Sequence, residues 1–185
     1  MEAGLDSLKK NQTWELVPKP ERKKLVGCKW IYKLKEGSTA GERPRYEARL
    51  VAQGFTQKEG VDYEEIFAPV VKRTSIRCLL ALVTLEDLEL EQLDVTTAFL
   101  HGELNEQIYM KQPPGFVVKG KEDWVCLLKR SLYGLKQSPR QWNHRFDKYV
   151  KSIGFNRSLF DSCVYVLHKR GQEDVHLLLY VDDML

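Results

Sequence analysis

Residues 176–183 read HLLLYVDD, an apolar run that ends on two adjacent carboxylates, Asp182 and Asp183. A continuous apolar run predicts a strand that is buried on both faces, here over residues 175–181. Carboxylates at the exit of such a strand are costly unless they are solvated, paired or bound to cations. The pair therefore indicates either a cation site or, since Asp favours turns, an ordinary turn after the strand.

A third carboxylate occupies a similar position in QLDVTTAFLHGEL, residues 92–104. The strand expected over residues 88–95 ends on Asp94. If the two strands lie side by side their carboxylates converge, and such hard oxygen ligands suit Mg²⁺ together with substrate phosphates and water. Two ions about 3.5–4 Å apart can activate an attacking 3′-oxygen and stabilise a leaving pyrophosphate. Metal-dependent phosphoryl transfer is one interpretation of these residues, and a plain turn is the other.

The strongest helix signal begins at Ser138 and Pro139, which suit the N-cap and N1 positions. Its apolar residues form one stripe that Gly154 can close, so we expect a helix over residues 138–153 that packs on the sheet. The stripe consists of Trp142, Phe146, Tyr149, Val150 and Ile153, and the residues expected on the exposed face are Arg140, Asn143 and Lys151.

Further elements surround these strands and this helix. Residues 25–35 and 43–55 read as a basic antiparallel hairpin, joined by a turn at residues 37–41. Residues 5–11 form a short helical candidate, and another helix can be capped by Thr74 or Ser75. The mixed order of strands and helices predicts an α+β fold. The apolar stripe of the capped helix consists of Ile76, Leu79, Leu80 and Val83.

The composition is that of globular material. The 185 residues suffice for one large domain or two small subdomains that share a core. The apolar runs are too short to cross a bilayer, and the first residues lack the apolar segment of a signal peptide, so we expect an intracellular chain without a membrane partner. The four cysteines are spaced too widely for a metal knuckle, and the four histidines form no zinc motif.

Charge is segregated along the chain although the net value is only +3. Residues 1–60 and 111–160 carry net charges of +5 and +8, whereas residues 61–110 and 161–185 carry −7 and −3. Basic segments beside a carboxylate cluster suit a polyanion that is held next to a metal site. Ordinary variation in surface charge is the alternative.

Residues 131–142 read SLYGLKQSPRQW, a long motif that is close to diagnostic of one family. With YVDDML at residues 180–185, the chain resembles the reverse transcriptase domain of copia-type LTR retrotransposons, part of a Pol polyprotein. The resemblance covers almost the whole chain, and its motifs occur in the family's order. The other matching blocks are NQTWELV (11–17), VGCKWIYKLK (26–35), ARLVAQGFTQ (48–57), FAPVVKRTSIR (67–77), LDVTTAFLHGEL (93–104) and IYMKQPPGF (108–116).

The resemblance implies a catalytic role for three carboxylates. Asp94 matches the first catalytic aspartate of the palm, and Asp182 and Asp183 match the pair on the palm hairpin. Together they would hold two Mg²⁺ ions, for which Mn²⁺ can substitute. The implied reaction is attack of a primer 3′-OH on the α-phosphate of a dNTP, without a protein nucleophile.

Nucleotide-binding roles follow from the same resemblance. Phe99 matches the aromatic residue that lies against the incoming sugar and rejects a 2′-OH by steric overlap. Ala98 and Phe99 would contribute backbone to the triphosphate site, and Arg49 matches the basic residue that grips the triphosphate. Tyr133 and Gly134 match the segment that supports the template and the nucleotide, where glycine permits close backbone approach. Core packing is the plainer alternative for Phe99, and a surface cation for Arg49.

Template and primer contacts are implied at the start of the strongest helix. Ser138 and Pro139 belong to the supporting segment, and Lys136 and Arg140 match phosphate contacts. Solvated cations at the start of a helix are the alternative for the last two.

Two departures from the family pattern stand out. Glu47 replaces the usual Lys and, by strand alternation, would share a face with Arg43, Arg45 and Arg49 and partly neutralise them. The chain also ends at Leu185, so we expect it to lack the return strand of the palm hairpin, the thumb and the RNase H domain. The isolated chain is therefore expected to be inactive as a polymerase.

The resemblance implies a truncated fold, with fingers mainly in residues 1–85 and a palm with interleaved fingers elements mainly in residues 86–185. Its activity would be RNA-directed DNA polymerisation, with dNTPs and a primed RNA or DNA template as partners. An integrase would precede it and an RNase H would follow it in the polyprotein, within a cytoplasmic particle that has nuclear access. Two alternatives stay open: a non-catalytic nucleic-acid-binding remnant of a truncated retroelement, and a structural Mg²⁺-binding protein.

Overall fold

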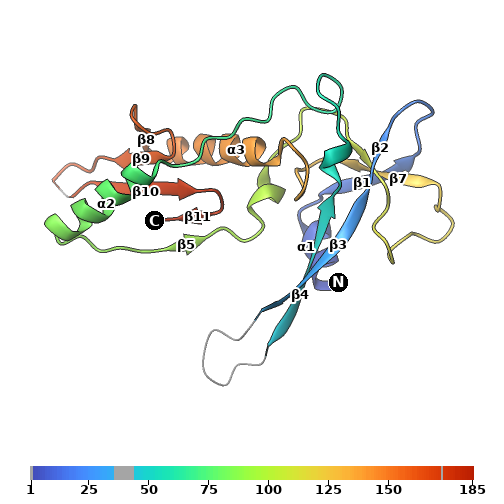
Figure 1. The fold of residues 1–185 in the computed structure, drawn as a ribbon, viewed down its shortest axis with the longest axis horizontal. Coiled ribbons are helices and arrows are strands. Elements are labelled where there is room, and N and C mark those ends of the chain that lie inside the picture. The colour runs from blue at the N-terminus through green and yellow to red at the C-terminus, as the bar shows by residue number, and fades with distance from the viewer. Residues whose placement is uncertain (1, 36–43, 172) are drawn as a thin grey trace.

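The computed structural model describes residues 2–35, 44–171 and 173–185, and it has the mixed helix and strand content expected from the sequence. Two lobes lie end to end (Figure 1), which we call the hairpin lobe and the aspartate lobe. No helix within this described part is long and apolar enough to cross a bilayer. The helices are α1 (Glu2–Lys10) in the hairpin lobe, and α2 (Arg73–Leu85) and α3 (Ser138–Ser152) in the aspartate lobe.

The hairpin lobe combines a small sheet with a protruding hairpin. The hairpin of β3 (Cys28–Lys35) and β4 (Arg45–Ala52) confirms the one predicted from the sequence, and its turn at residues 37–41 lies outside the described residues. Leu5 and Leu8 of α1 are buried, and α1 packs against β4. The sheet consists, in spatial order, of β1 (Trp14–Pro18), β7 (Trp124–Leu128), β6 (Tyr109–Met110) and β2 (Leu25–Val26).

The aspartate lobe has a sheet that is covered on both faces. In β10 (Val175–Tyr180), Leu179 belongs to the core cluster that contains Trp142 of α3. Leu178 belongs to a different cluster, which contains Leu79 of α2. Because successive strand residues point to opposite faces, this is the two-sided burial predicted from the apolar run, confirmed for the middle of the strand. The sheet consists, in spatial order, of β5 (Leu93–Asp94), β11 (Asp183–Met184), β10, β9 (Val164–Leu167) and β8 (Asn156–Arg157).

The return strand of the 175–184 hairpin is present, so the expectation that the chain lacks it was wrong. Tyr180 pairs with Asp183 across β10 and β11, and β11 pairs in turn with β5. The backbone of Leu185 continues the pairing, with reciprocal hydrogen bonds to Leu178 of 2.8 and 3.0 Å. Two residues after a two-residue tip suffice for pairing because β5 and β10 flank them. The upstream strand expected over residues 88–95 is shorter than predicted, only Leu93–Asp94.

The helix predicted over residues 138–153 is confirmed as α3, and Gly154 follows it with a φ of +102°. Its capping prediction was wrong. Gln137 is the N-cap and makes no side-chain cap bond, while Ser138 lies inside the first turn and donates its hydroxyl hydrogen bond to the carbonyl of Leu132 (2.7 Å).

The apolar stripe of α3 is buried along one row rather than across its full width. Trp142, Phe146 and Val150, at positions i, i+4 and i+8, are buried against the sheet. Tyr149 and Ile153 are about half exposed, at 56% and 50%, because Tyr149 lies at the margin of this row and Ile153 is the C-cap residue after the last helical residue. Asn143, expected on the surface, is buried on the other side of the row, so the prediction was wrong for these three residues. Lys151 is exposed as expected, and Arg140 is half-buried.

The start of α2 also differs from its prediction. Lys72 is the N-cap and makes no side-chain cap bond. Ser75, a predicted cap, instead donates its hydroxyl hydrogen bond to the carboxylate of Asp161 (2.6 Å). The predicted stripe packs through Leu79 and Ile76, whereas Leu80 is exposed.

Candidate active site

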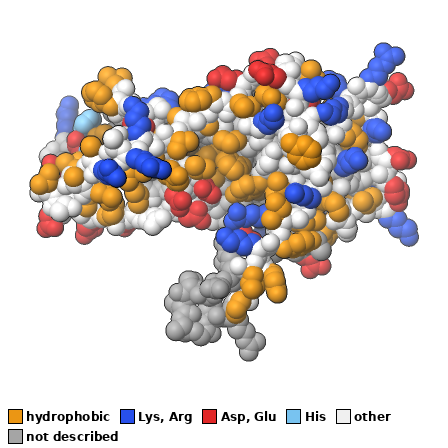
Figure 2. Space-filling view, viewed as in Figure 1, with side chains coloured by type: hydrophobic (Ala, Val, Ile, Leu, Met, Phe, Trp, Pro, Cys, Tyr) orange, Lys and Arg blue, Asp and Glu red, His pale blue; other side chains and the backbone are white. Residues whose placement is uncertain are grey.

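A cavity of about 540 Å³ lies where the two lobes meet. The hairpin lobe contributes α1, through Gly4 and Ser7, and residues 46–50 of β4. The aspartate lobe contributes residues 94–97 and Asp182. Figure 2 shows acidic and basic side chains close together near the base of the protruding hairpin. The cavity is therefore bounded by opposite charges from two different lobes.

The backbones of the three candidate carboxylates lie side by side at one end of the sheet, with Asp182 in the tip of the hairpin. Asp183 of β11 is directly paired with Asp94 of β5, and the N–H of Val95 donates to the carbonyl of Asp182 (3.0 Å). Directly paired residues of antiparallel strands have Cβ atoms about 4.5–5.5 Å apart. Asp94 and Asp182 line the cavity. Among residues 2–35, 44–171 and 173–185, however, no three His, Cys, Asp or Glu side chains are placed to hold one ion in common.

Two of these carboxylates have the chemistry that suits a Mg²⁺ ion. Mg²⁺ is usually bound through one or two carboxylates, with phosphate oxygens and waters filling its octahedral shell. Asp94 and Asp182 provide two carboxylates toward one open space, so their chemistry suits this ion.

Arg49 is held by a neighbouring acid on the other side of the cavity. Its Nε donates to Glu47 Oε1 at 2.8 Å, and its guanidinium lies 5.5 Å from the centre of the Tyr133 ring. The hydrogen bond to Glu47 raises the pKa of Arg49, and the charge of Asp182 contributes in the same direction. Burial raises the pKa of the Tyr133 phenol, although the charge of Arg49 opposes this.

The predicted pairing of Glu47 with the basic residues of its strand is confirmed for Arg49. Arg43 and the side chain of Arg45 lie outside the described part of the chain.

A family model described as "Reverse transcriptase (RNA-dependent DNA polymerase)" matches residues 11–185. The chain belongs to this family. It is 53% identical over its whole length of 185 residues to the "Retrovirus-related Pol polyprotein from transposon TNT 1-94" of Nicotiana tabacum, and covers 14% of that relative. It is 47% identical over 176 residues to the "Retrovirus-related Pol polyprotein from transposon RE2" of Arabidopsis thaliana. This alignment covers 95% of the chain and 12% of the relative.

The similarity extends to a yeast element at lower identity. The chain is 29% identical over 187 aligned positions to the "Transposon Ty1-BL Gag-Pol polyprotein" of Saccharomyces cerevisiae, with 98% of the chain and 10% of that relative covered. No solved structure matches it. The chain is thus a copia-type reverse transcriptase domain, and it spans about a seventh of the Nicotiana tabacum polyprotein.

Within this reverse transcriptase domain, Phe99 stands behind the cavity wall. It follows Ala98, which is fully buried, in the short 3₁₀ helix η2 (Ala98–His101). Its ring meets Tyr133 edge to face, with centroids 4.8 Å apart, and lines a second cavity of about 40 Å³. Phe99 therefore supports Tyr133, which lines the larger cavity directly.

Gly134 permits a close contact between its own segment and β4, and the neighbours Leu132 and Leu135 share one core cluster with Leu50 and Ala52 of that strand. Its φ is +90°, and a Cβ atom built there would lie 2.1 Å from the carbonyl oxygen of Ala52 in β4. A Cβ atom at Gly54 would in turn lie 2.0 Å from the carbonyl oxygen of Gly134. The backbone N–H of Ala52 donates to the carbonyl of Tyr133 (2.7 Å). The close backbone approach at Gly134 is thus to β4.

The predicted template and primer residues have partners within the domain. Lys136 Nζ donates to the Tyr63 hydroxyl at 3.2 Å, and Arg140 forms an ion pair with Glu65 at 2.7 Å. Pro139 lines the second cavity. Ser138 is only 1% exposed and bonds to the carbonyl of Leu132, which holds the start of α3, while its place in the segment that supports the template stays a prediction.

Trp142 contacts the hairpin of β10 and β11, which we call the carboxylate hairpin because it carries Asp182 and Asp183. The sequence did not indicate this contact of Trp142. Its indole Nε1–H donates to the carbonyl of Val181, the residue before Asp182, at 2.6 Å. The periodicity predicted Trp142 only as a core residue. Its partner lies 39 positions away, so no local pattern could reveal the bond.

Proposed function

We propose that this domain adds dNTPs to a primer by RNA-directed DNA synthesis, in the cavity between its two lobes. The observation that carries the proposal is the lining: Asp94 and Asp182 on one side, Arg49 and Tyr133 on the other. Such a cavity attracts metal ions with one side and a triphosphate with the other. In this assignment the aspartate lobe is the palm, and the β3–β4 hairpin belongs to the fingers.

Asp94 and Asp182 would hold two Mg²⁺ ions, with Asp183 adding negative charge beside them. When bound, these ions would activate the primer 3′-oxygen and stabilise the leaving pyrophosphate. The domain's own contribution is to orient the carboxylates. Asp94 is fixed by its pairing with β11, and Asp182 by the hydrogen bond from the N–H of Val95.

Arg49 would bind the triphosphate while it stays hydrogen-bonded to Glu47. A guanidinium has five N–H donors in a planar fork, and the bond to Glu47 uses Nε. The side chain is 48% exposed, so its terminal nitrogens can reach a ligand. Glu47 would then orient the fork while it reduces the net attraction for phosphate.

The whole protein's context is part of the proposal. The relatives are named as Pol polyproteins, which supports a domain that works beside an integrase and an RNase H on a primed RNA or DNA template. A second candidate, nucleic-acid binding without catalysis, is favoured by the ion pair that partly neutralises Arg49.

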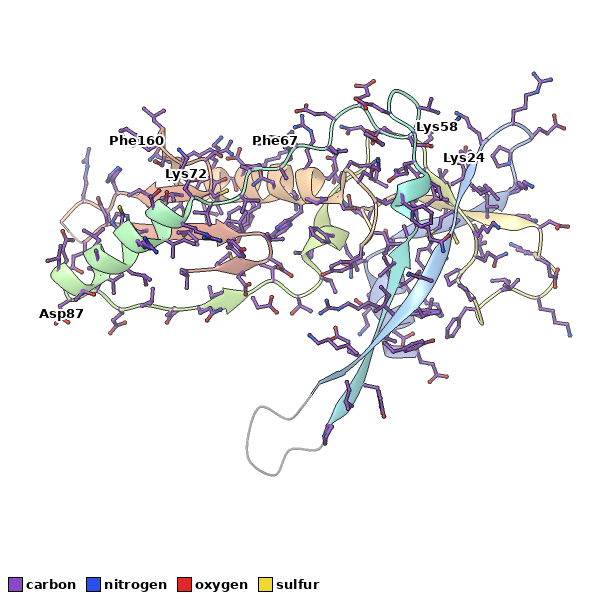
Figure 3. All side chains as sticks on the ribbon, in the orientation of Figure 1. Lys24, Lys58, Phe67, Lys72, Asp87 and Phe160 are labelled. Carbon is purple, nitrogen blue, oxygen red and sulfur yellow. The ribbon has the colours of Figure 1, made fainter. Side chains whose placement is uncertain are left out.

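Single-nucleotide incorporation tests the proposal. The domain is assayed with Mg²⁺, primer–template and dNTP, both as the 185-residue chain and joined to the following segment of a related Pol polyprotein. We expect the joined form to incorporate the nucleotide and Asp94→Asn to abolish incorporation. Asp87→Asn is the matched control, because Asp87 lies at the far end of the aspartate lobe (Figure 3). Binding of primer–template without incorporation in either form would support the second candidate instead.

A further inference from the structure

We propose that Trp142 is a positioning residue for Asp182, and that it acts by clamping the tip of the carboxylate hairpin through its indole N–H. The inference rests on the proposed function in one respect, that Asp182 serves the reaction. The clamp itself stands on the geometry of three consecutive residues, Tyr180 to Asp182, and of the elements that hold them.

The donor of the clamp is buried and packed against a second aromatic ring. Trp142 is 6% exposed in the buried row of α3, and its ring packs against Phe146 with centroids 5.6 Å apart. Its bond to the Val181 carbonyl, at 2.6 Å, joins this row to the hairpin tip. A rigid aromatic anchor on a helix can therefore fix one carbonyl group of a turn.

The acceptor of the clamp is in an unfavourable conformation. Val181 has a φ of +60°, which is rare for a β-branched residue. It is the first of the two tip residues between β10 and β11, a position with positive φ that hairpins usually fill with glycine or asparagine. Such a conformation persists only where the surroundings enforce it.

The surroundings enforce it from two sides. The Val181 carbonyl accepts from Trp142, and the next carbonyl, that of Asp182, accepts from the N–H of Val95 at 3.0 Å. The two bonds come from different elements, α3 and the segment after β5. With successive carbonyl groups pinned this way, the carboxylate of Asp182 is held toward the cavity that Asp94 also lines.

Trp142→Phe tests the clamp because it removes the N–H donor and keeps an aromatic ring in the core. Trp30→Phe is the matched control. Trp30 also donates its indole N–H to a backbone carbonyl, that of Pro114 at 3.0 Å, but it lies in the hairpin lobe. Both variants lose one hydrogen bond from an indole N–H to a backbone carbonyl. Only the bond of Trp142 holds the carboxylate hairpin.

The first measurement is amide hydrogen exchange of the 185-residue chain, which needs no activity. We expect exchange in the segment 179–184 to rise about tenfold or more in Trp142→Phe and to stay unchanged in Trp30→Phe. Val181→Gly in the Trp142→Phe background should restore protection in part, because glycine adopts the tip conformation without strain. The rescue also separates a local clamp from general loss of stability.

The second measurement compares the effects on kcat and on the KM for dNTP, in the joined form of the domain that incorporates nucleotides. Trp142→Phe should lower kcat by about 10- to 100-fold, the cost of a small misplacement of a reacting group. The KM for dNTP should change by less than about twofold, since Arg49 is untouched. Equal exchange in segment 179–184 for Trp142→Phe and wild type would overturn the clamp. Faster exchange without an effect on kcat would leave the clamp in place and count against the role of Asp182.

Discussion

Asp161 is a single buried carboxylate that joins two distant segments. It accepts hydrogen bonds from Ser75 Oγ at 2.6 Å, from Lys72 N at 2.9 Å and from Cys163 N at 3.0 Å. Lys72 also donates through Nζ to the carbonyl of Phe160 at 2.7 Å, and the two labels lie close together in Figure 3. Burial alone would raise the pKa of Asp161, but these hydrogen bonds hold the pKa below its ordinary value.

Asp161→Asn should therefore destabilise the domain in a pH-dependent way. A carboxylate whose pKa is lowered by folding stabilises the fold above its unfolded-state pKa of about 3.9, and this contribution is lost as the pH falls through the folded-state value. At neutral pH we expect the free energy of unfolding to fall by about 1–3 kcal/mol. Urea unfolding at a series of pH values should show the gap to wild type closing below about pH 4. A gap that stays constant into strong acid would contradict the assignment, and the exposed Asp87→Asn should show no gap.

Gly134→Ala should cost more than the strain of its backbone angle. Gly115 is the matched control, because its φ of +82° is similar to the +90° of Gly134 and a Cβ atom there would meet nothing within 4 Å. Gly115→Ala should cost about 1–2 kcal/mol for the left-handed conformation alone. Gly134→Ala should exceed it clearly, because its methyl group would overlap the carbonyl oxygen of Ala52. Equal thermal unfolding of the two variants would show that this backbone contact adds little to stability.

At the level of elements, the contribution of α3 to the free energy of unfolding comes mainly from one row of buried side chains. Phe146 is 5% exposed and meets Tyr165 edge to face, whereas Tyr149 on the next face is 56% exposed. We expect Phe146→Ala to lower the free energy of unfolding by about 3–5 kcal/mol. Tyr149→Ala should change it by no more than about 0.5 kcal/mol, as is usual on a surface. Chemical denaturation of the two variants compares them directly, and similar losses would mean that the full stripe is buried in solution.

The same helix shows what local sequence can predict. Apolar spacing located α3 and the β3–β4 hairpin, because spacing alone decides which residues share a face. Strand alternation likewise paired Glu47 with Arg49. Spacing could not predict that Tyr149 lies at the margin, since that depends on the position of the sheet beneath.

Other features of the site depended on contacts between distant segments. The return strand β11 has only two residues, Asp183 and Met184, which is too few to show an alternation of apolar and polar residues. The sequence pattern therefore could not predict it. Its pairing comes from β5, 89 positions upstream at Asp94. The family motifs predicted which carboxylates would lie together, but neither the bond from Trp142 to Val181 nor the contact of Gly134 with β4 has a local sequence pattern.

Over the whole molecule, positive charge comes from two separate segments. Residues 1–60, which include α1 and β4, carry a net charge of +5, and residues 111–160, which include Tyr133 and α3, carry +8. If the proposed function holds, binding to an RNA–DNA duplex is led by phosphate contacts. We expect affinity to fall at least about tenfold between roughly 50 and 200 mM salt, with little dependence on base sequence. Fluorescence anisotropy measures this, and Asp94→Asn should give the same salt slope. Affinity that does not change with salt would rule out a phosphate-led interface.

The contact between Gly54 and Gly134 places main chain directly against main chain. Where two elements meet through side chains, a substitution can move them apart or together by the size of a methyl group. Here the separation is fixed by peptide dimensions, which do not vary with sequence. The side of the active site that carries Arg49 and Tyr133 therefore has a fixed internal spacing: its lining can change in charge and shape over many substitutions while the distance between β4 and the Tyr133 segment stays the same.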